Sequence, residues 1–233
     1  MFGVLGMSNS VAQESNAANF LSVLDKHVSK MDTELFRGEL YVEKHPVRND
    51  NHKFFGEGTF SLGSILFDDQ KYYDVNLKYD VYGDQVLIHH EQLPMSMVIQ
   101  LDNARVHQFS LDNRVFVNTS FTTNNKEEIS GFIETLYEGE MLQVYKKHVK
   151  KIYRRLEGKL FYEFKNDANY YVNYNDEYYE LKNLKSLRKI LVAHKSKTQE
   201  LINKYKRSGA PNFEQKLINI ISDLDTHLIT LRR

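Results

Sequence analysis

The stretch Thr59–His89, TFSLGSILFDDQKYYDVNLKYDVYGDQVLIH, decides the fold class of this chain. Its first part, Thr59–Phe67, is rich in apolar β formers and ends at the turn Asp68-Asp69-Gln70. Tyr72–Tyr82 then alternates, and a second tight turn separates it from the apolar run Gln85–His89. One face carries Tyr73, Val75, Leu77, Tyr79 and Val81, and the other carries Asp74, Asn76, Lys78 and Asp80. Three strands joined by short turns predict an antiparallel meander.

Similar patterns extend on both sides of this stretch, separated by turns rich in Asp, Asn and Gly. The further predicted strands are Leu35–Lys44, Met95–Leu101, Arg105–Leu111, Arg114–Phe121, Phe132–Tyr137, Glu140–Ile152, Lys159–Phe164, Tyr170–Tyr174 and Tyr178–Leu181. Short strands at even spacing favour antiparallel architectures over alternating βαβ units. The sequence therefore predicts a mainly β (α+β) fold, with an antiparallel meander that forms a barrel-like or sandwich domain.

Helical spacing of apolar residues occurs at both ends of the chain. Ser15–Met31 is predicted as a short N-terminal helix, and the period returns to helical after Asn183. A break at Ser208–Pro211 precedes a final helix that Asn212 can cap. That helix has an apolar stripe formed by Leu217, Ile220, Ile221, Leu224, Leu228 and Leu231. We expect the stripe to cover the sheet or a barrel mouth, and binding to a partner protein is the alternative.

The first residues are typical of the end of a secretory signal. An apolar run, Met1–Met7, is followed by Ser10-Val11-Ala12, which places small residues at the positions that signal peptidase requires before Gln13. We expect residues 1–12 to be a remnant of a signal peptide that starts upstream, and an apolar, disordered N-terminus is the alternative. Residues 13–182 are then the β domain with its short helix, and residues 183–233 are C-terminal helices packed on it. The mature chain has no predicted transmembrane segment.

Charge and cysteine usage exclude several classes of function. The chain has 31 basic and 31 acidic residues, so no overall positive field favours binding to nucleic acid. It has no cysteine, which excludes disulfides, thiolate nucleophiles and cysteine-ligated metals.

Local motifs for catalysis or metal binding are also missing from the sequence. The one histidine cluster, His89-His90-Glu91, lies in a predicted strand, where neighbouring side chains point to opposite faces. Paired carboxylates occur at predicted turns, as Asp68-Asp69, Glu127-Glu128 and Asp176-Glu177. We therefore predict no catalytic, cofactor-binding or metal-ligating residues, no cofactor and no enzymatic activity. A site assembled from distant strands would leave no local motif.

Two surface features allow both a functional and a structural interpretation. The basic run Lys146–Arg155, KKHVKKIYRR, is either a patch for an anionic surface, such as lipid headgroups or an envelope polymer, or a solvated strand edge. The tyrosines near the end of the β region are either a platform for stacking carbohydrate or ordinary strand surface. They are Tyr170, Tyr171, Tyr174, Tyr178 and Tyr179.

Three segments resemble uncharacterised exported proteins of Bacteroidota. They are Leu35-Phe36-x-Gly38-x-Leu40-Tyr41, the run from Phe60 to Asp80, and Tyr178-Tyr179-x-Leu181 with the basic amphipathic helices that follow. The resemblance implies a periplasmic or outer-membrane-associated location, and it implies no activity and no functional residues.

These observations leave three hypotheses for function. The first is a non-enzymatic exported envelope protein, a module that binds an envelope protein or polymer. The second is a lipocalin-like carrier that encloses a small apolar ligand. The third is a hydrolase whose site is assembled from distant strands.

Overall fold

The computed structural model describes residues 34–47, 50–89, 94, 97–121, 129–207, 209 and 211–232. The predicted signal remnant, residues 1–12, and the predicted helix Ser15–Met31 lie outside the described residues. The strands are β1 Glu39–Leu40, β2 Ser61–Phe67, β3 Gln70–Asp80, β4 Gln85–His89, β5 Ile99–Gln100, β6 Val106–Leu111, β7 Arg114–Asn118, β8 Phe132–Glu138, β9 Leu142–Glu157, β10 Lys159–Tyr174 and β11 Glu177–Glu180. The α-helices are α2 Leu187–Ile190, α3 Lys195–Lys206 and α4 Phe213–Arg232. Short 3₁₀ turns are η1 Asn103–Arg105, η2 Thr119–Phe121, η3 Leu184–Ser186 and η4 Val192–His194.

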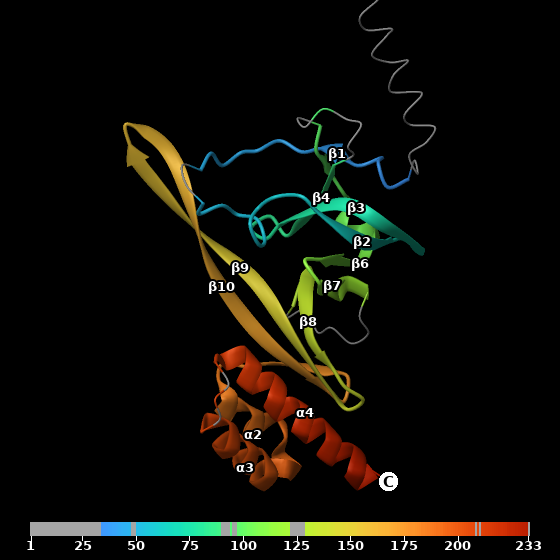
Figure 1. Cartoon of the computed structure of the whole chain (residues 1–233), viewed down its shortest axis with the longest axis vertical. Helices are drawn as coiled ribbons and strands as arrows, with labels where there is room; N and C mark the ends of the chain where they lie inside the picture. Colours follow the sequence, from blue (N-terminus) through green and yellow to red (C-terminus); the bar gives the residue numbers. More distant parts are fainter. Residues whose placement is uncertain are drawn as a thin grey trace, which may run out of the picture.

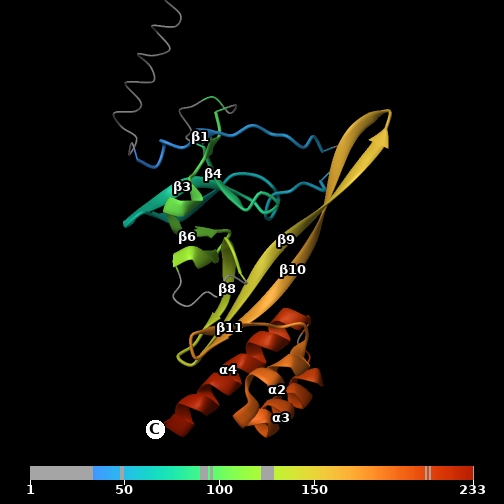
Figure 2. The ribbon, with the colours of Figure 1, turned by 180° about the vertical axis from the view of Figure 1, so that it is seen from behind.

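All the strands belong to one twisted antiparallel sheet (Figure 1). Its order is β1-β5-β4-β3-β2-β6-β7-β8-β9-β10-β11, so β1 and β11 are its two ends and the sheet does not close into a barrel. The helices gather at the end that carries β9, β10 and β11, as the view from behind also shows (Figure 2). The predicted fold class, mainly antiparallel β with C-terminal helices, is confirmed.

The tight turns of the meander depend on Asp and Asn in the left-handed conformation. Asp68 and Asp84 have φ of 51°, and the hairpin between β6 and β7 turns through Asp112 and Asn113, with φ of 51° and 59°. These two side chain types tolerate positive φ better than other non-glycine residues do. The sequence located these turns correctly because turn chemistry is local.

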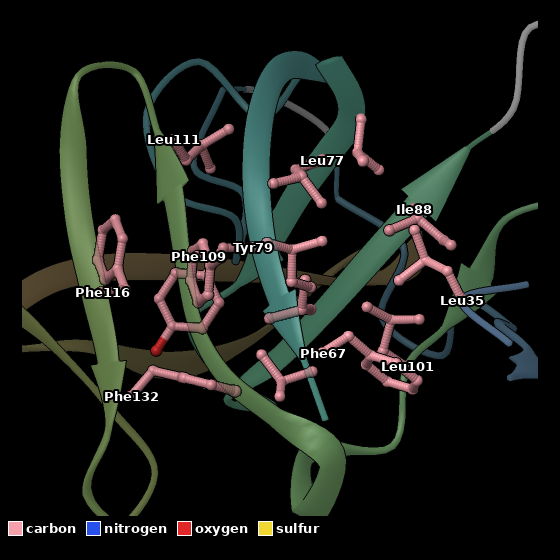
Figure 3. Close-up of a cluster of buried hydrophobic side chains, with 14 of the residues drawn as sticks. Leu35, Phe67, Leu77, Tyr79, Ile88, Leu101, Phe109, Leu111, Phe116 and Phe132 are labelled. Atoms are coloured by element: carbon pink, nitrogen blue, oxygen red, sulfur yellow. The ribbon is translucent and has the colours of Figure 1, made fainter. Parts of the chain in front are cut away.

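A first hydrophobic cluster fills the concave side of β2 to β8 (Figure 3). Aromatic rings from neighbouring strands meet there, with Phe109 and Phe116 stacked at a centroid distance of 4.7 Å and Tyr79 against both. The Tyr79 hydroxyl donates a hydrogen bond to Asp84 at 2.5 Å, so the polar end of this buried ring is satisfied. The strands bend sharply around the cluster at Gly63, where a Cβ would lie 2.1 Å from the carbonyl oxygen of Ser110.

A second hydrophobic cluster joins the helices to β9, β10 and β11. Leu142, Val144 and Val172 of the sheet pack against the stripe of α4, and five of the six predicted stripe residues are buried. The sixth, Leu231, is exposed at the end of the helix. The stripe therefore covers the sheet, as predicted. Asn212 caps α4, because its Oδ1 accepts a hydrogen bond from the backbone N–H of Gln215 at 2.8 Å.

The buried carboxylate of Asp225 in α4 also binds the turn between β8 and β9. Asp225 accepts backbone hydrogen bonds from Glu140, Met141 and Leu142, at 3.2, 2.8 and 2.8 Å. The turn approaches the helix closely, because a Cβ at Gly139 would lie 2.5 Å from Asp225 Oδ2. Asp225 thus satisfies three N–H groups that the sheet leaves unpaired.

Residues 41–47 and 50–56, which we call the strap, leave the sheet after β1 and cross to β10. The prediction of a strand over Leu35–Lys44 is wrong outside Glu39–Leu40, because the backbone from Tyr41 onward bonds to loops and to distant strands. The carbonyl oxygens of Pro46 and Asn51 accept hydrogen bonds from the N–H groups of Tyr162 and Phe164, both at 2.9 Å. An alternating pattern alone could not distinguish this crossing segment from a strand.

The hairpin of β9 and β10 is longer than the sequence predicted. Lys159–Phe164 and Tyr170–Tyr174 were expected as separate strands, whereas β10 runs without a break from Lys159 to Tyr174. The polar residues 165–169 suggested a loop, but β9 pairs with every one of them and keeps them extended. The half of the hairpin beyond the sheet projects from the rest of the chain (Figures 1 and 2).

Candidate functional site, a polar pocket between two cores

A row of cross-strand neighbours marks the boundary between the two hydrophobic clusters. Phe116 of β7 pairs with Glu134 of β8, Glu134 pairs with Lys146 of β9, and Lys146 pairs with Tyr170 of β10. Directly paired residues share one face of a sheet, so the four side chains lie side by side on the concave face. The two middle members of this row are charged, and they begin a polar region between the clusters.

Glu134 is the buried centre of this region, with only 3% of its surface exposed. Arg114 Nη1 donates to its Oε1 at 2.5 Å, and His148 Nε2 lies 2.5 Å from its Oε2. Burial alone would raise the pKa of Glu134, but the hydrogen bonds from His148 and Arg114 outweigh it and hold that pKa below its ordinary value. The carboxylate is therefore ionised at neutral pH and accepts a hydrogen bond from each partner, which orients the imidazole.

A second ion pair fixes the side of the region next to the helices. Lys146 Nζ donates to Glu214 Oε2 of α4 at 2.6 Å, and the Tyr170 hydroxyl donates to the same oxygen at 3.3 Å. Burial, followed by the charge of Glu214, raises the pKa of Tyr170 to about 12. Tyr170 therefore remains a neutral donor at any physiological pH, and the positive charge of Lys146 is paired with the carboxylate of Glu214.

Lys150 differs from the other cations, because no carboxylate in the described residues pairs with it. Its ammonium donates a hydrogen bond to the carbonyl oxygen of His52 in the strap at 2.8 Å. Burial lowers the pKa of Lys150, and burial together with Lys150 and Lys78 lowers the pKa of His52. His52 is thus neutral at neutral pH, and the charge of Lys150 is left without a matching negative charge.

A pocket of about 530 Å³ that is open to solvent is lined by Arg114, Lys146, His148, Lys150 and Tyr170. Its floor consists of Lys146, His148 and Lys150 of β9 with Asn166, Ala168 and Tyr170 of β10. Ala168 pairs with His148, so a small side chain stands in the middle of the floor and leaves it hollow. The walls are the hairpin of β6 and β7, through Asp112 and Arg114, and the end of the strap, through Phe54, Phe55 and Gly56.

The arrangement is suited to holding an anionic group. Arg114 and Lys150 offer a planar guanidinium and a compact ammonium, which are the two cations that proteins use for carboxylates and phosphates. His148 lines the pocket and is paired with the buried carboxylate of Glu134, and such a pair can act as a general base toward a bound water. In its described lining there is no serine, threonine or cysteine that could serve as a nucleophile.

The structure places the predicted surface features as follows. The basic run divides, since Lys146, His148 and Lys150 face the pocket, whereas Lys147 donates to Asp84 on the opposite side of β9 at 2.8 Å. The ladder with β8 ends at Lys146, so among the described residues β9 has an open edge from Lys147 onward. This geometry fits the interpretation of the run as a strand edge, and it adds a pocket that the sequence did not reveal.

The other predicted residues lie away from the pocket. His89 is buried in β4 beside Phe60, and His90 and Glu91 lie outside the described residues. No group of metal-ligating side chains occurs in the described part of the chain. Tyr170 and Tyr174 pack against the second hydrophobic cluster, and Tyr178 contacts the ring of Tyr145 at 5.6 Å, so these rings do not form one stacking platform.

Sequence reasoning missed Arg114 and Glu134, which come from different strands. The available signal was Glu134 itself, a charged residue two positions after Phe132 and therefore on the core face of the same predicted strand. A carboxylate on that face needs cationic partners, but only the fold identifies them.

Comparisons of the chain with protein-family models, with curated proteins and with solved structures gave no match. None of the helices in the described residues has both the length and the apolar character needed to cross a bilayer.

Proposed function

We propose that this protein is a non-enzymatic, exported binding module of the cell envelope, and that its polar pocket holds an anionic group of its ligand. The observation that carries the proposal is Lys150, a half-buried ammonium in an open pocket without a carboxylate partner in the described chain. Moving a charge out of water is costly, and one carbonyl oxygen offsets only part of that cost. A bound carboxylate or phosphate would supply the missing negative charge.

The lining supports a ligand that is only partly polar. Phe54, Phe55 and Val81 contribute apolar surface beside the cations. The ring of Phe55 lies 5.0 Å from that of His148, so an apolar wall meets the polar floor directly. Pockets of this kind orient a ligand through a few polar groups and gain affinity from the apolar surface.

Calorimetric titration with citrate and with pyrophosphate tests the proposal, because one probe presents carboxylates and the other phosphates. The wild-type chain is expected to bind at least one of them, and Lys150→Met is expected to weaken that binding at least about tenfold. Lys151→Met is the matched control, because Lys151 is the next residue, is not among the residues that line the pocket, and is paired with Asp167. Failure of the wild type to bind either anion, or equal binding by Lys150→Met, would refute the proposal.

The proposed location has its own test. A signal that ends at Ser10-Val11-Ala12 requires the mature protein to begin near Gln13. Intact-mass measurement of protein from an envelope fraction should give that N-terminus. Finding Met1 on that protein would contradict export by this route.

Hydrolysis is a second candidate, and the Glu134–His148 pair is the observation in its favour. The wild-type chain would then cleave a generic ester such as p-nitrophenyl acetate faster than His148→Ala does. Equal rates for the two proteins would leave the pair with a structural role. The lipocalin-like alternative has no specific observation in its favour, since buried rings occupy the concave face of the sheet.

A further inference from the structure

The distal part of the β9–β10 hairpin, residues 151–165, forms an arm that projects away from both hydrophobic clusters (Figures 1 and 2). The strap holds the arm at Tyr162 and Phe164, and the hairpin turns at Gly158, whose φ is 73°. No Cβ at Gly158 would meet another atom within 4 Å, so the turn at Gly158 is open to solvent.

Two leucines form an apolar pair at this tip. Leu156 and Leu160 face each other across the two strands, next to the turn. Leu156 is 79% exposed and Leu160 is 37% exposed. Neither leucine belongs to one of the two hydrophobic clusters.

Basic residues surround the leucine pair. The arm has five basic side chains, Lys151, Arg154, Arg155, Lys159 and Lys165, and two acidic ones, Glu157 and Glu163. Tyr153 lies on the face opposite the leucines, with Lys165 Nζ 5.0 Å and Arg155 Cζ 5.8 Å from its ring centroid. An apolar tip, a net positive charge and an amphipathic aromatic ring are together typical of segments that enter a membrane interface.

We propose that this arm docks on an anionic lipid surface, with Leu156 and Leu160 inserted among the acyl chains and the basic residues at the headgroups. The positive charge complements an anionic bilayer, which attracts each nearby lysine or arginine. The size of the tip also favours lipid over protein, because stable protein interfaces bury about 1,600 Å² and two leucines offer far less. A fluid leaflet accepts a small apolar tip without a complementary shape.

The absence of tryptophan from the chain provides a site-specific reporter. Leu156→Trp creates a single tryptophan at the tip, and Val192→Trp creates one at a control position that is 61% exposed on η4. With vesicles of equal parts phosphatidylglycerol and phosphatidylcholine, the emission of Leu156→Trp should shift to shorter wavelength, and that of Val192→Trp should stay unchanged. An unshifted Leu156→Trp emission, or an equal shift at Val192→Trp, would overturn the proposal.

Vesicle co-sedimentation measures how much the two leucines and the positive charge of the arm each contribute to membrane binding. Leu156→Ser with Leu160→Ser should reduce binding to the anionic vesicles at least about tenfold, since both side chains lose their apolar atoms. Pure phosphatidylcholine vesicles should bind the wild type weakly, and high salt should release it. Lys150→Met should bind like the wild type, which separates the arm from the pocket. Retained binding by the double serine variant, with an unchanged melting temperature, would show that the tip does not insert.

Discussion

Asp225 and Met141 are 84 residues apart in the sequence, and the Asp225 carboxylate accepts the backbone N–H of Met141 at 2.8 Å. The same carboxylate bonds the next residue, Leu142, at the first position of β9. Because β9 supplies the pocket floor, this contact connects the placement of the C-terminal helix to the site.

Asp225→Ala should lower the free energy of unfolding by at least about 3 kcal/mol, because it leaves the N–H groups of Glu140, Met141 and the buried Leu142 without this acceptor. Urea denaturation followed by circular dichroism measures the change. The control is Asp223→Ala, which removes a surface pair with Lys204 and a hydrogen bond from the Tyr205 hydroxyl, and it should cost about 1 kcal/mol. Similar losses for the two variants would contradict this role of Asp225.

Lys53→Met should also be strongly destabilising, because Lys53 and Asp80 are only 5% and 3% exposed and their charged groups lie 2.9 Å apart. Its removal leaves a buried, unpaired carboxylate, for which we expect a loss of about 3–5 kcal/mol in chemical denaturation. Glu43→Gln changes the more exposed partner of the same lysine and should cost less than about 1 kcal/mol. The prediction fails if Glu43→Gln is as harmful as Lys53→Met.

Glu134 should make the protein sensitive to acid. Its pKa in the folded state is below the ordinary value of 4.5, so the ionised form stabilises the fold at higher pH. That contribution is fully present above pH 4.5 and is lost as the pH falls through the folded-state pKa. Between about pH 5 and pH 3 the wild type should therefore lose more stability than Glu134→Gln. Thermal unfolding at the two pH values measures the difference. If the melting temperatures of the wild type and of Glu134→Gln fall equally, Glu134 is not the group responsible.

Asn113 tests the turn chemistry between β6 and β7. Its φ of 59° is easily adopted by glycine and strained for alanine. Asn113→Gly should leave the melting temperature nearly unchanged, whereas Asn113→Ala should destabilise the chain by about 1 kcal/mol. Equal melting temperatures for the two variants would show that this turn relaxes without cost.

The sequence predicted those parts of the fold whose cause is local. Turns with Asp or Asn at positive φ, the alternation of β3 from Val75 to Tyr79 and the Asn212 cap all depend on neighbouring residues, and the structure confirms them. The predicted alternation is wrong at Tyr73, which is 67% exposed, because Asp74 has a φ of 52° and the pairing of β3 with β2 shifts there. The continuous β10 could not be predicted, because its polar middle is extended only through pairing with β9.

The pocket was hidden for a similar reason. Arg114, Glu134 and His148 belong to three successive strands, β7, β8 and β9. Their side chains meet only because of the register in which these strands pair. Lys150 appeared in the sequence as one lysine in a basic run, and nothing local separates it from Lys151. Only the alternation of β9 within the folded sheet places one of them in the pocket and the other outside it.

The strap has a consequence for how the chain is made. It is synthesised long before β10, yet Pro46 and Asn51 bond to Tyr162 and Phe164. While the protein emerges from the ribosome, or crosses a membrane unfolded, these carbonyl oxygens have only water as a partner. The strap is therefore an early segment that docks late, and the wall it gives to the pocket is complete only when most of the chain is available.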